Sequence, residues 1–563
     1  MDVSHIIDSL NDAQREAVTA QNDHLLVLAG AGSGKTRVLV HRMAWLMSVD
    51  RVPPTSILAV TFTNKAAKEM RYRVEQMMQI PTRGLWIGTF HGIAHRLLRS
   101  HWKDAGLPEN FQVLDSDDQL RLIKRVMREN RIDESQWPPK QAQWFINSQK
   151  DEGLRADHIQ ENPGDHFTNT MLKIYRQYEK LCQQGGLVDF GELLLRSHEL
   201  WLHRPELLSH YQQRFQHILV DEFQDTNTIQ YAWLQVLASN RVPLTVVGDD
   251  DQSIYGWRGA KIENIQQYQR DFPNSRLVRL EQNYRSTKTI LKAANSVIAN
   301  NQGRLGKELW TDGVEGEPIS LYAAFNEQDE ANYIADSISA WVSEGNLRSE
   351  CAILYRSNAQ SRVLEEALMR QGIPYRVYGG LRFYDRQEIR NALAYLRLVH
   401  YHRDDAAFER VVNIPTRGIG AKSLQEIREY ATGQGISLWE SSERLLAAGQ
   451  VKGRAKTGLQ QFMEIINTLS EMAGHASLQG LMKQAIESSG LKDYHASEKG
   501  EKGQARVENL EELVSALADY DVEEGVDPLA EFIAQAALDA GESQADAHED
   551  EADHRVARAK YQL

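Results

Sequence analysis

Short apolar runs alternate with segments of helical period in the first part of the chain. Such runs lie at residues 25–28, 57–62, 218–220 and 244–247, and helical patterns follow them. Strands that are apolar on both faces are typical of a parallel sheet covered by helices on its two sides. The pattern therefore predicts an α/β core built from these four strands.

Two long segments lack strand signals and are mainly helical in period. Residues 92–214 contain amphipathic patterns such as the one at 116–130. Residues 381–545 contain further patterns at 458–472 and 506–520. We expect each segment to form a helical domain inserted into an α/β core.

A second series of strand-like runs separates these helical segments. It predicts another α/β core, which begins near residue 281 and does not finish, so the fold class is α/β with two cores and two helical insertions. The strand-like runs lie at 277–280, 319–322, 352–355 and 375–378. The predicted boundaries are 1–91 and 215–280 for the first core, 92–214 for its insertion, 281–380 for the incomplete second core, 381–545 for the second helical domain, and 546–563 for an acidic, solvated tail.

Composition and charge fit a soluble, cytoplasmic protein. The 563 residues exceed a single hydrophobic core, and no apolar run reaches the ~18 residues of a membrane span. Cys182 and Cys351 stand alone, which predicts reduced thiols rather than a disulfide or metal site.

The net charge is −14, but residues 519–553 hold thirteen acidic residues and no Lys or Arg. The rest of the chain is nearly balanced and can carry a basic groove for nucleic acid.

The run at 25–28 leads into a glycine-rich turn that has the character of a phosphate-binding loop. Glycines allow backbone N–H groups to approach phosphate oxygens, Lys35 supplies a positive charge, and Thr36 offers a hydroxyl to Mg²⁺ at the start of a helix. A purely structural strand–turn–helix corner is the alternative, since Ala29 stands where the usual pattern has its first glycine. The expected phosphate-binding residues are Ala29, Gly30, Ala31, Gly32, Ser33, Gly34, Lys35 and Thr36.

Carboxylates follow another apolar run, in the segment HILVDEFQD. The carboxyl ends of parallel strands meet at one edge of a sheet, so Asp221 is expected to help hold Mg²⁺ and Glu222 to polarise the attacking water. A polar turn is the alternative. The next strand brings Gln252 to the same edge, where we expect it to sense the terminal phosphate.

Aromatic side chains and a guanidinium cluster directly after Gln252. Tyr255, Trp257 and Arg258 lie beside glycines and outside any helical apolar stripe. Rings and guanidinium planes suit stacking of successive bases of a single strand, which tolerates any sequence. Aromatic core residues near a turn are the alternative interpretation.

These motifs, in this order, resemble those of the UvrD/Rep/PcrA group of superfamily 1 DNA helicases, from residue 10 to about residue 541. The group's phosphate loop has the form AGAGSGKT, including Ala29. The resemblance implies a P-loop NTPase with tandem RecA-like cores. It also implies that Gln14 in LNDAQREAV and Arg37 position ATP, and that Tyr284 in LEQNYRST stacks on adenine. Arg285 would act as an arginine finger.

The resemblance also implies a path for single-stranded DNA across the first core. TFTNKAAKEM, GTFHG and the aromatic segment would face the strand, and PTRGIG in the second, regulatory helical domain would hold duplex phosphates through backbone N–H groups. A plain interhelical turn is the alternative for PTRGIG. The residues concerned are Phe62, Thr63, Asn64, Thr89, Phe90, His91, Tyr255, Trp257, Arg258, Arg417, Gly418 and Gly420.

Two motifs of the group do not occur in the sequence. Members of the group continue with segments resembling HTAKGLEF and VxxTRA, which complete the second core and add a second phosphate-facing arginine. We therefore expect a truncation or frame shift near Asp546, with weakened ATP turnover.

The resemblance implies an ATP- and Mg²⁺-dependent helicase that moves 3′ to 5′ on single-stranded DNA and acts at single-strand/duplex junctions. DNA repair proteins are its expected partners. A fragment that binds nucleotide and DNA without coupling them is the rival hypothesis, and an unrelated P-loop ATPase is a weaker one.

Overall fold

The computed structural model describes residues 3–547 except 22, 81–83, 240, 257–258, 358–359, 378–382, 499–500, 519 and 521–526. Its centre is a six-stranded parallel sheet in the order β3-β2-β6-β7-β1-β8. The strands are β1 (Leu25–Ala29), β2 (Ile57–Thr61), β3 (Trp86–Thr89), β6 (His217–Val220), β7 (Leu244–Gly248) and β8 (Arg276–Leu280). The four predicted strands of the first core are thereby confirmed.

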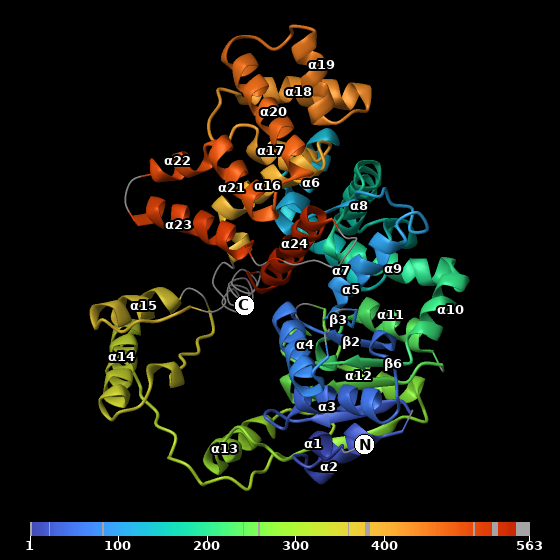
Figure 1. Cartoon of the computed structure of the whole chain (residues 1–563), viewed down its shortest axis with the longest axis vertical. Coiled ribbons are helices and arrows are strands. Elements are labelled where there is room, and N and C mark those ends of the chain that lie inside the picture. The colour runs from blue at the N-terminus through green and yellow to red at the C-terminus, as the bar shows by residue number, and fades with distance from the viewer. Residues whose placement is uncertain are drawn as a thin grey trace.

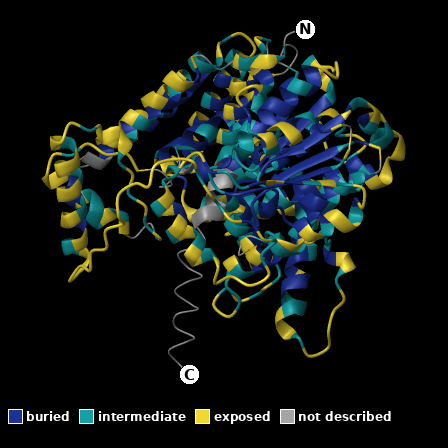
Figure 2. Ribbon diagram, turned by 90° about the horizontal axis from the view of Figure 1, so that it is seen from below, coloured by how far each residue is buried: buried dark blue, intermediate teal, exposed yellow. Residues whose placement is uncertain are grey.

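Alternate residues of β1 face two different cores, as the period of a strand requires. Val27 packs in a cluster with α3 and α4, whereas Leu26 and Leu28 pack with α5, α11 and α12. Both faces are therefore buried, as Figure 2 shows for the strands of this sheet. The helices around the sheet are α1 (Ser4–Ile7), α2 (Asp12–Thr19), α3 (Lys35–Ser48), α4 (Asn64–Met78), α5 (Phe90–Ser100), α11 (Thr228–Ala238) and α12 (Glu263–Asp271).

A helical region extends from α5 to β6, with its own core around Tyr175 and Tyr178. The helix predicted over 116–130 is confirmed as α6. This region contains α6 (Ser116–Glu129), α7 (Pro139–Asp151), α8 (His166–Gly185), α9 (Phe190–His203), α10 (Pro205–Arg214) and a two-stranded pair of β4 (Gln112–Val113) and β5 (Leu187–Val188).

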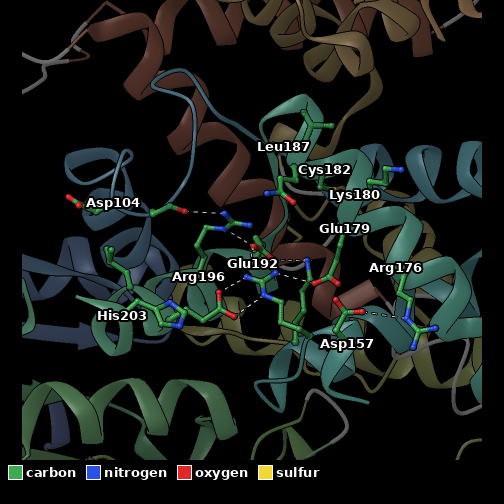
Figure 3. A pocket seen from close by; sticks show the side chains of 16 residues that line it. Asp104, Asp157, Arg176, Glu179, Lys180, Cys182, Leu187, Glu192, Arg196 and His203 are labelled. Carbon is green, nitrogen blue, oxygen red and sulfur yellow. Dashed lines mark hydrogen bonds and ion pairs between the residues drawn. The ribbon is translucent and has the colours of Figure 1, made fainter. Parts of the chain in front are cut away.

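A charged cavity of about 390 Å³ lies within this helical region (Figure 3). Arg155 donates two hydrogen bonds of 2.8 Å to Glu192 and further bonds to Glu199 and Glu179. Burial alone would raise the pKa of Glu192, but Lys150, Arg155 and other cations hold it well below its usual range. The charges lining the cavity neutralise one another, so we assign this cluster to the stability of the helical region.

Replacing Arg155 tests that assignment. Because Arg155→Met leaves several buried carboxylates without their cation, we expect the free energy of unfolding of this region to fall by about 3–5 kcal/mol. Arg128→Met is the matched control, since Arg128 of α6 pairs with Glu134 at the surface, where such pairs contribute about 0–1 kcal/mol. Urea unfolding followed by tryptophan fluorescence measures both, and equal midpoints for the two variants would contradict the assignment.

The segment that follows the sheet differs from the prediction. Residues 277–280 form part of β8, at the edge of the first sheet, and residues 319–322, 352–355 and 375–377 form no strand, so these later strand predictions are wrong for this structure; residue 378 lies outside the described residues. Leu321 and Leu354 are 97% and 93% exposed. A strand requires a hydrogen-bonded neighbour, and these extended segments lie beside helices instead. The helices are α13 (Lys288–Ile298), α14 (Glu327–Ser343) and α15 (Ser361–Arg370), of which α14 and α15 stand apart from the sheet in Figure 1.

The last part of the chain is helical, as predicted, and forms one large core around Phe408 and Phe462. The final helix contributes to two cores. Its Phe532 packs in the core around Phe408 and Phe462, and its Leu538 packs in the core that the sheet forms with α5, α11 and α12. The first two residues of the tail predicted over 546–563 belong to this last helix, and the rest of the tail lies outside the described residues. The helices are α16 (Gln387–His400), α17 (Asp405–Val411), α18 (Ala421–Gln434), α19 (Leu438–Ala447), α20 (Gly453–Ala473), α21 (Leu478–Ser489), α22 (Leu491–Ala496), α23 (Glu501–Ala516) and α24 (Pro528–Ala547).

Short 3-10 helices within the described residues are η1 (Pro54–Ser56), η2 (Ala156–His158), η3 (Phe223–Asp225), η4 (Asp250–Gln252), η6 (Arg348–Glu350) and η8 (Phe383–Asp385). Both cysteines are free thiols, Cys182 buried and Cys351 half-buried. None of the helices within the described residues has the length and apolar character needed to cross a bilayer.

Candidate nucleotide and DNA site

The phosphate loop connects β1 to α3 at the carboxyl edge of the sheet. Gly32 and Gly34 have φ of +67° and +90°, which L side chains rarely adopt. A Cβ on Gly30 would lie only 2.0 Å from Leu309 Cδ2, and one on Gly32 would lie 2.5 Å from Asn283 Nδ2. The glycines are therefore required both by the turn and by the residues packed over it.

Lys35 and Thr36 begin α3 and face the acidic pair after β6. The Lys35 Nζ lies 3.7 Å from Glu222 Oε2 and 4.0 Å from Asp249 Oδ2, and the Thr36 hydroxyl donates to Asp221 Oδ2 at 3.4 Å. Burial, together with the neighbouring charge of Glu222, raises the pKa of Asp221 to about 7. The structure thus brings the predicted loop and carboxylates together.

A hydrogen-bonded chain joins Glu222 to the predicted phosphate sensor. Glu222 itself has φ of +50°, a rare value for a residue with a side chain. The Gln224 amide donates to Glu222 Oε2 at 2.9 Å and accepts from the Asp249 backbone N–H at 2.9 Å. Asp249 Oδ2 in turn accepts from the Gln252 amide at 2.5 Å. Sequence reasoning missed Gln224 and Asp249, although both lie within the motifs it selected.

The LEQNYRST segment docks on the phosphate loop. The Asn283 amide donates to the Ala31 carbonyl at 2.6 Å, and the Tyr284 backbone N–H donates to the Gly32 carbonyl at 3.0 Å. A Cβ on Gly32 would lie 2.8 Å from Arg285 Cβ, so Arg285 starts directly beside the loop. This position agrees with the expected reach of Arg285 toward a terminal phosphate.

The far end of the loop contacts the residues expected to position the base. Gln14 is buried, and its amide donates to the Ser33 carbonyl at 2.9 Å while its oxygen accepts from the Asn11 backbone N–H. Asn11 also donates to the Tyr284 hydroxyl at 2.8 Å, an interaction that the sequence did not reveal. Arg37 donates to the Ser9 carbonyl at 2.9 Å. Tyr284 is 53% exposed, so one ring face can meet a ligand.

The residues of the first core that are predicted to face DNA separate into half-buried and buried ones. The rings of Phe62 and Tyr255 are stacked, 5.5 Å apart at 26°. Thr63 caps α4, and the Asn64 amide donates to Asp539 of α24. Trp257 and Arg258 lie outside the described residues.

Three of these predicted contacts need correction. Phe90 packs in the core and is only 4% exposed, and the buried Thr89 hydroxyl accepts from the Gly92 N–H as the cap of α5. Neither side chain is therefore presented to a DNA strand. His91, next to them, lies over the ring of Phe190. In the second helical region, Arg417 is expected to act through its backbone N–H, but this N–H donates to Asn413 Oδ1 at 2.7 Å, while its side chain donates to the Tyr395 hydroxyl.

The backbone of the PTRGIG turn retains groups that suit an anion. Gly418 has φ of +75°, and Gly420 is the N-cap of α18, whose first N–H groups point away from the helix. Contact with duplex phosphates through this turn stays a prediction.

The comparison with known proteins agrees with this geometry. Residues 10–273 match the UvrD/REP helicase N-terminal domain, and residues 278–553 match the UvrD-like helicase C-terminal domain. The chain belongs to the UvrD/REP helicase family. Within that family it is 58% identical to DNA helicase II of Escherichia coli (strain K12) over 98% of this chain and 77% of that protein. It is 54% identical to DNA helicase II of Haemophilus influenzae (98% and 76%) and 41% identical to the ATP-dependent DNA helicase PcrA of Bacillus subtilis (97% and 74%).

Proposed function

We propose that this UvrD-like helicase couples ATP hydrolysis to 3′ to 5′ movement on single-stranded DNA and to duplex unwinding in DNA repair. The observation that carries the proposal is that the phosphate loop, the acidic pair and Arg285 meet at one edge of the sheet. Tyr255, whose ring stacks on Phe62, follows Gln252 of the same edge by three residues in the sequence. The proposed location of this chain is the cytoplasm, where the DNA of the Escherichia coli and Bacillus subtilis relatives lies. Single-strand/duplex junctions and DNA repair proteins are the proposed partners.

Each residue of the nucleotide site has a chemical role in this proposal. The loop N–H groups and Lys35 bind the phosphates, and Arg285 stabilises charge that develops on the terminal phosphate. Glu222 orients the attacking water and accepts its proton. Tyr284 stacks on the base, with Gln14 and Arg37 holding the adjoining chain.

The donor set at the loop fits Mg²⁺, an oxygen-preferring cation. The Thr36 hydroxyl and the buried Asp221 carboxylate would hold it, and the acidic pair of Asp221 and Glu222 favours a nearby cation because the pair is only partly compensated. The ion would neutralise phosphate charge.

Coupling to DNA follows from chain connectivity. Gln252 and Tyr255 lie three residues apart, so a shift of the backbone that brings Gln252 toward a terminal phosphate would also move the ring that stacks on Phe62. We propose that this shift changes the grip on the strand during each ATP cycle.

Removing the Tyr255 ring tests the DNA contact. Tyr255→Ala is expected to weaken binding of a labelled oligo-dT by about 1–3 kcal/mol, the contribution of one stacked base. Fluorescence anisotropy measures the change, with Tyr494→Ala as control because Tyr494 is exposed on α22, in the second helical region. Unchanged affinity for Tyr255→Ala would exclude the ring from the DNA path.

Strand displacement tests the proposed activity and its direction. Two duplexes of equal length, one with a 3′ single-stranded tail and one with a 5′ tail, are incubated with the chain, ATP and Mg²⁺. The proposal predicts displacement of the 3′-tailed duplex. Binding of both duplexes without displacement of either would favour a protein that holds nucleotide and DNA without coupling them.

A further inference from the structure

A segment after α13 returns to the first core and covers the nucleotide site. We call residues 304–310 the strap. Leu309 packs against Gly30 of the phosphate loop, as the 2.0 Å distance from a Cβ on Gly30 shows. Trp310 exchanges backbone hydrogen bonds with Glu281 and Asn283, beside Arg285. The strap therefore touches the loop and the Arg285 segment together.

The strap also places two cations on the acidic turn after β7. One oxygen each of Asp249, Asp250 and Asp251 lies within 4.8 Å of the others, and the Lys307 ammonium contacts all three carboxylates. Its distance is 2.7 Å to Asp249 Oδ1 and 2.9 Å to Asp251 Oδ2, and its side chain is only 2% exposed. Arg304 adds a bidentate pair to Asp251 with two distances of 2.7 Å.

The pKa values of Lys307 and Asp251 shift in opposite directions, and each shift favours the charged form. Burial on its own would lower the pKa of Lys307, but Asp249 and its neighbours raise it above the ordinary lysine value. Burial would raise the pKa of Asp251, but hydrogen bonds from Arg304 and Lys307 lower it. The ammonium therefore takes the place that a metal ion would need among these carboxylates.

Asp249 connects this cluster to the phosphate end of the nucleotide site. Its Oδ1 faces Lys307, whereas its Oδ2 accepts from Gln252 and lies 4.0 Å from the Lys35 ammonium. Two lysines thus approach opposite oxygens of one carboxylate. Without Lys307, Lys35 would be drawn toward Asp249 and away from phosphate, and the Gln252 amide would lose its fixed acceptor.

We propose that Lys307 is a positioning residue for ATP hydrolysis, which acts through Asp249 to hold Lys35 and Gln252 in place. The inference rests on the proposed ATPase activity. The inference assigns a function to the strap, because Lys307 lies within the residues that match the UvrD-like helicase C-terminal domain. Lys307 would therefore follow a movement of that domain. Lys307 does not touch the nucleotide in this scheme.

Steady-state ATP hydrolysis with single-stranded DNA tests the role of Lys307. Lys307→Met is expected to lower kcat about 10-fold to 100-fold, with KM changed less than about threefold, because the phosphate contacts are misplaced rather than removed. Lys307→Arg keeps the charge and is expected to recover most of kcat. Lys292→Met is the control, since Lys292 is an exposed lysine on α13, and its kcat should equal that of the unmodified chain.

A double variant separates positioning from folding. Lys307→Met with Asp250→Asn removes one charge of each sign, so the buried cluster keeps its net charge, and this variant tests the proposal if the single variant does not fold. A kcat within threefold of the unmodified value in any folded Lys307→Met protein would overturn the proposal. No ATP hydrolysis by the unmodified chain would instead refute the proposed function itself.

Discussion

Lys35→Ala is expected to abolish DNA-stimulated ATP hydrolysis, with kcat/KM reduced about 100-fold to 1,000-fold or more. The reason is that the Lys35 ammonium lies at the start of α3, between the phosphate loop and the acidic pair, where we propose that it stabilises charge on the transferred phosphoryl group. A coupled assay of phosphate release measures the loss. Nucleotide affinity should also fall, because the same ammonium would contact bound phosphate in the proposed site.

The control for Lys35 is Lys173→Ala, which removes an exposed lysine on α8 in the helical region. Its rate should match that of the unmodified chain. An unchanged rate in Lys35→Ala would mean that the loop is only a structural corner, despite its glycines with positive φ.

Arg285→Ala is expected to reduce kcat by about 10³-fold to 10⁵-fold, the range for loss of an arginine finger. The residue begins beside Gly32 and belongs to a segment held on the loop by Asn283 and Tyr284, and from there we propose that its guanidinium reaches the terminal phosphate. Binding of a fluorescent ATP analogue should change far less than kcat, because the contact strengthens in the transition state.

Two further variants sharpen that result. Arg285→Lys should not restore the rate, since a point charge does not reproduce the planar, bidentate guanidinium. Arg279→Ala removes an exposed arginine from the adjacent β8 and should leave kcat unchanged. Equal losses in the Arg285→Ala and Arg279→Ala proteins would point to a general effect of charge and would contradict the finger.

The sequence predicted the parts of the fold that depend on local pattern. β1, β6 and β7 are apolar on both faces, and this alone identifies strands buried between helices. β3 was missed because Gly88 and Thr89 interrupt its apolar run. The strands expected at 319–322 and 352–355 have the right side chains, but a local preference cannot supply the neighbouring strand that a ladder requires.

The nucleotide site was predicted in outline because its motifs are contiguous. Lys35, Asp221 and Arg285 each stand in a short segment with recognisable chemistry, and the parallel sheet brings those segments together. The supporting contacts could not be predicted in this way. Asn11 meets Tyr284 from 273 residues away, and Lys307 meets Asp250 from 57 residues away, with no pattern in the intervening sequence.

Steady-state ATP hydrolysis by the purified 563-residue chain, with and without single-stranded DNA, tests the central claim most directly. The geometry of the loop, the acidic pair and the Phe62–Tyr255 stack predicts that DNA raises turnover about tenfold or more, the range of coupled sites. The stimulation should require Mg²⁺ and be absent in Lys35→Ala. Saturating DNA binding with no change in ATP turnover would contradict the claim that the two sites are coupled.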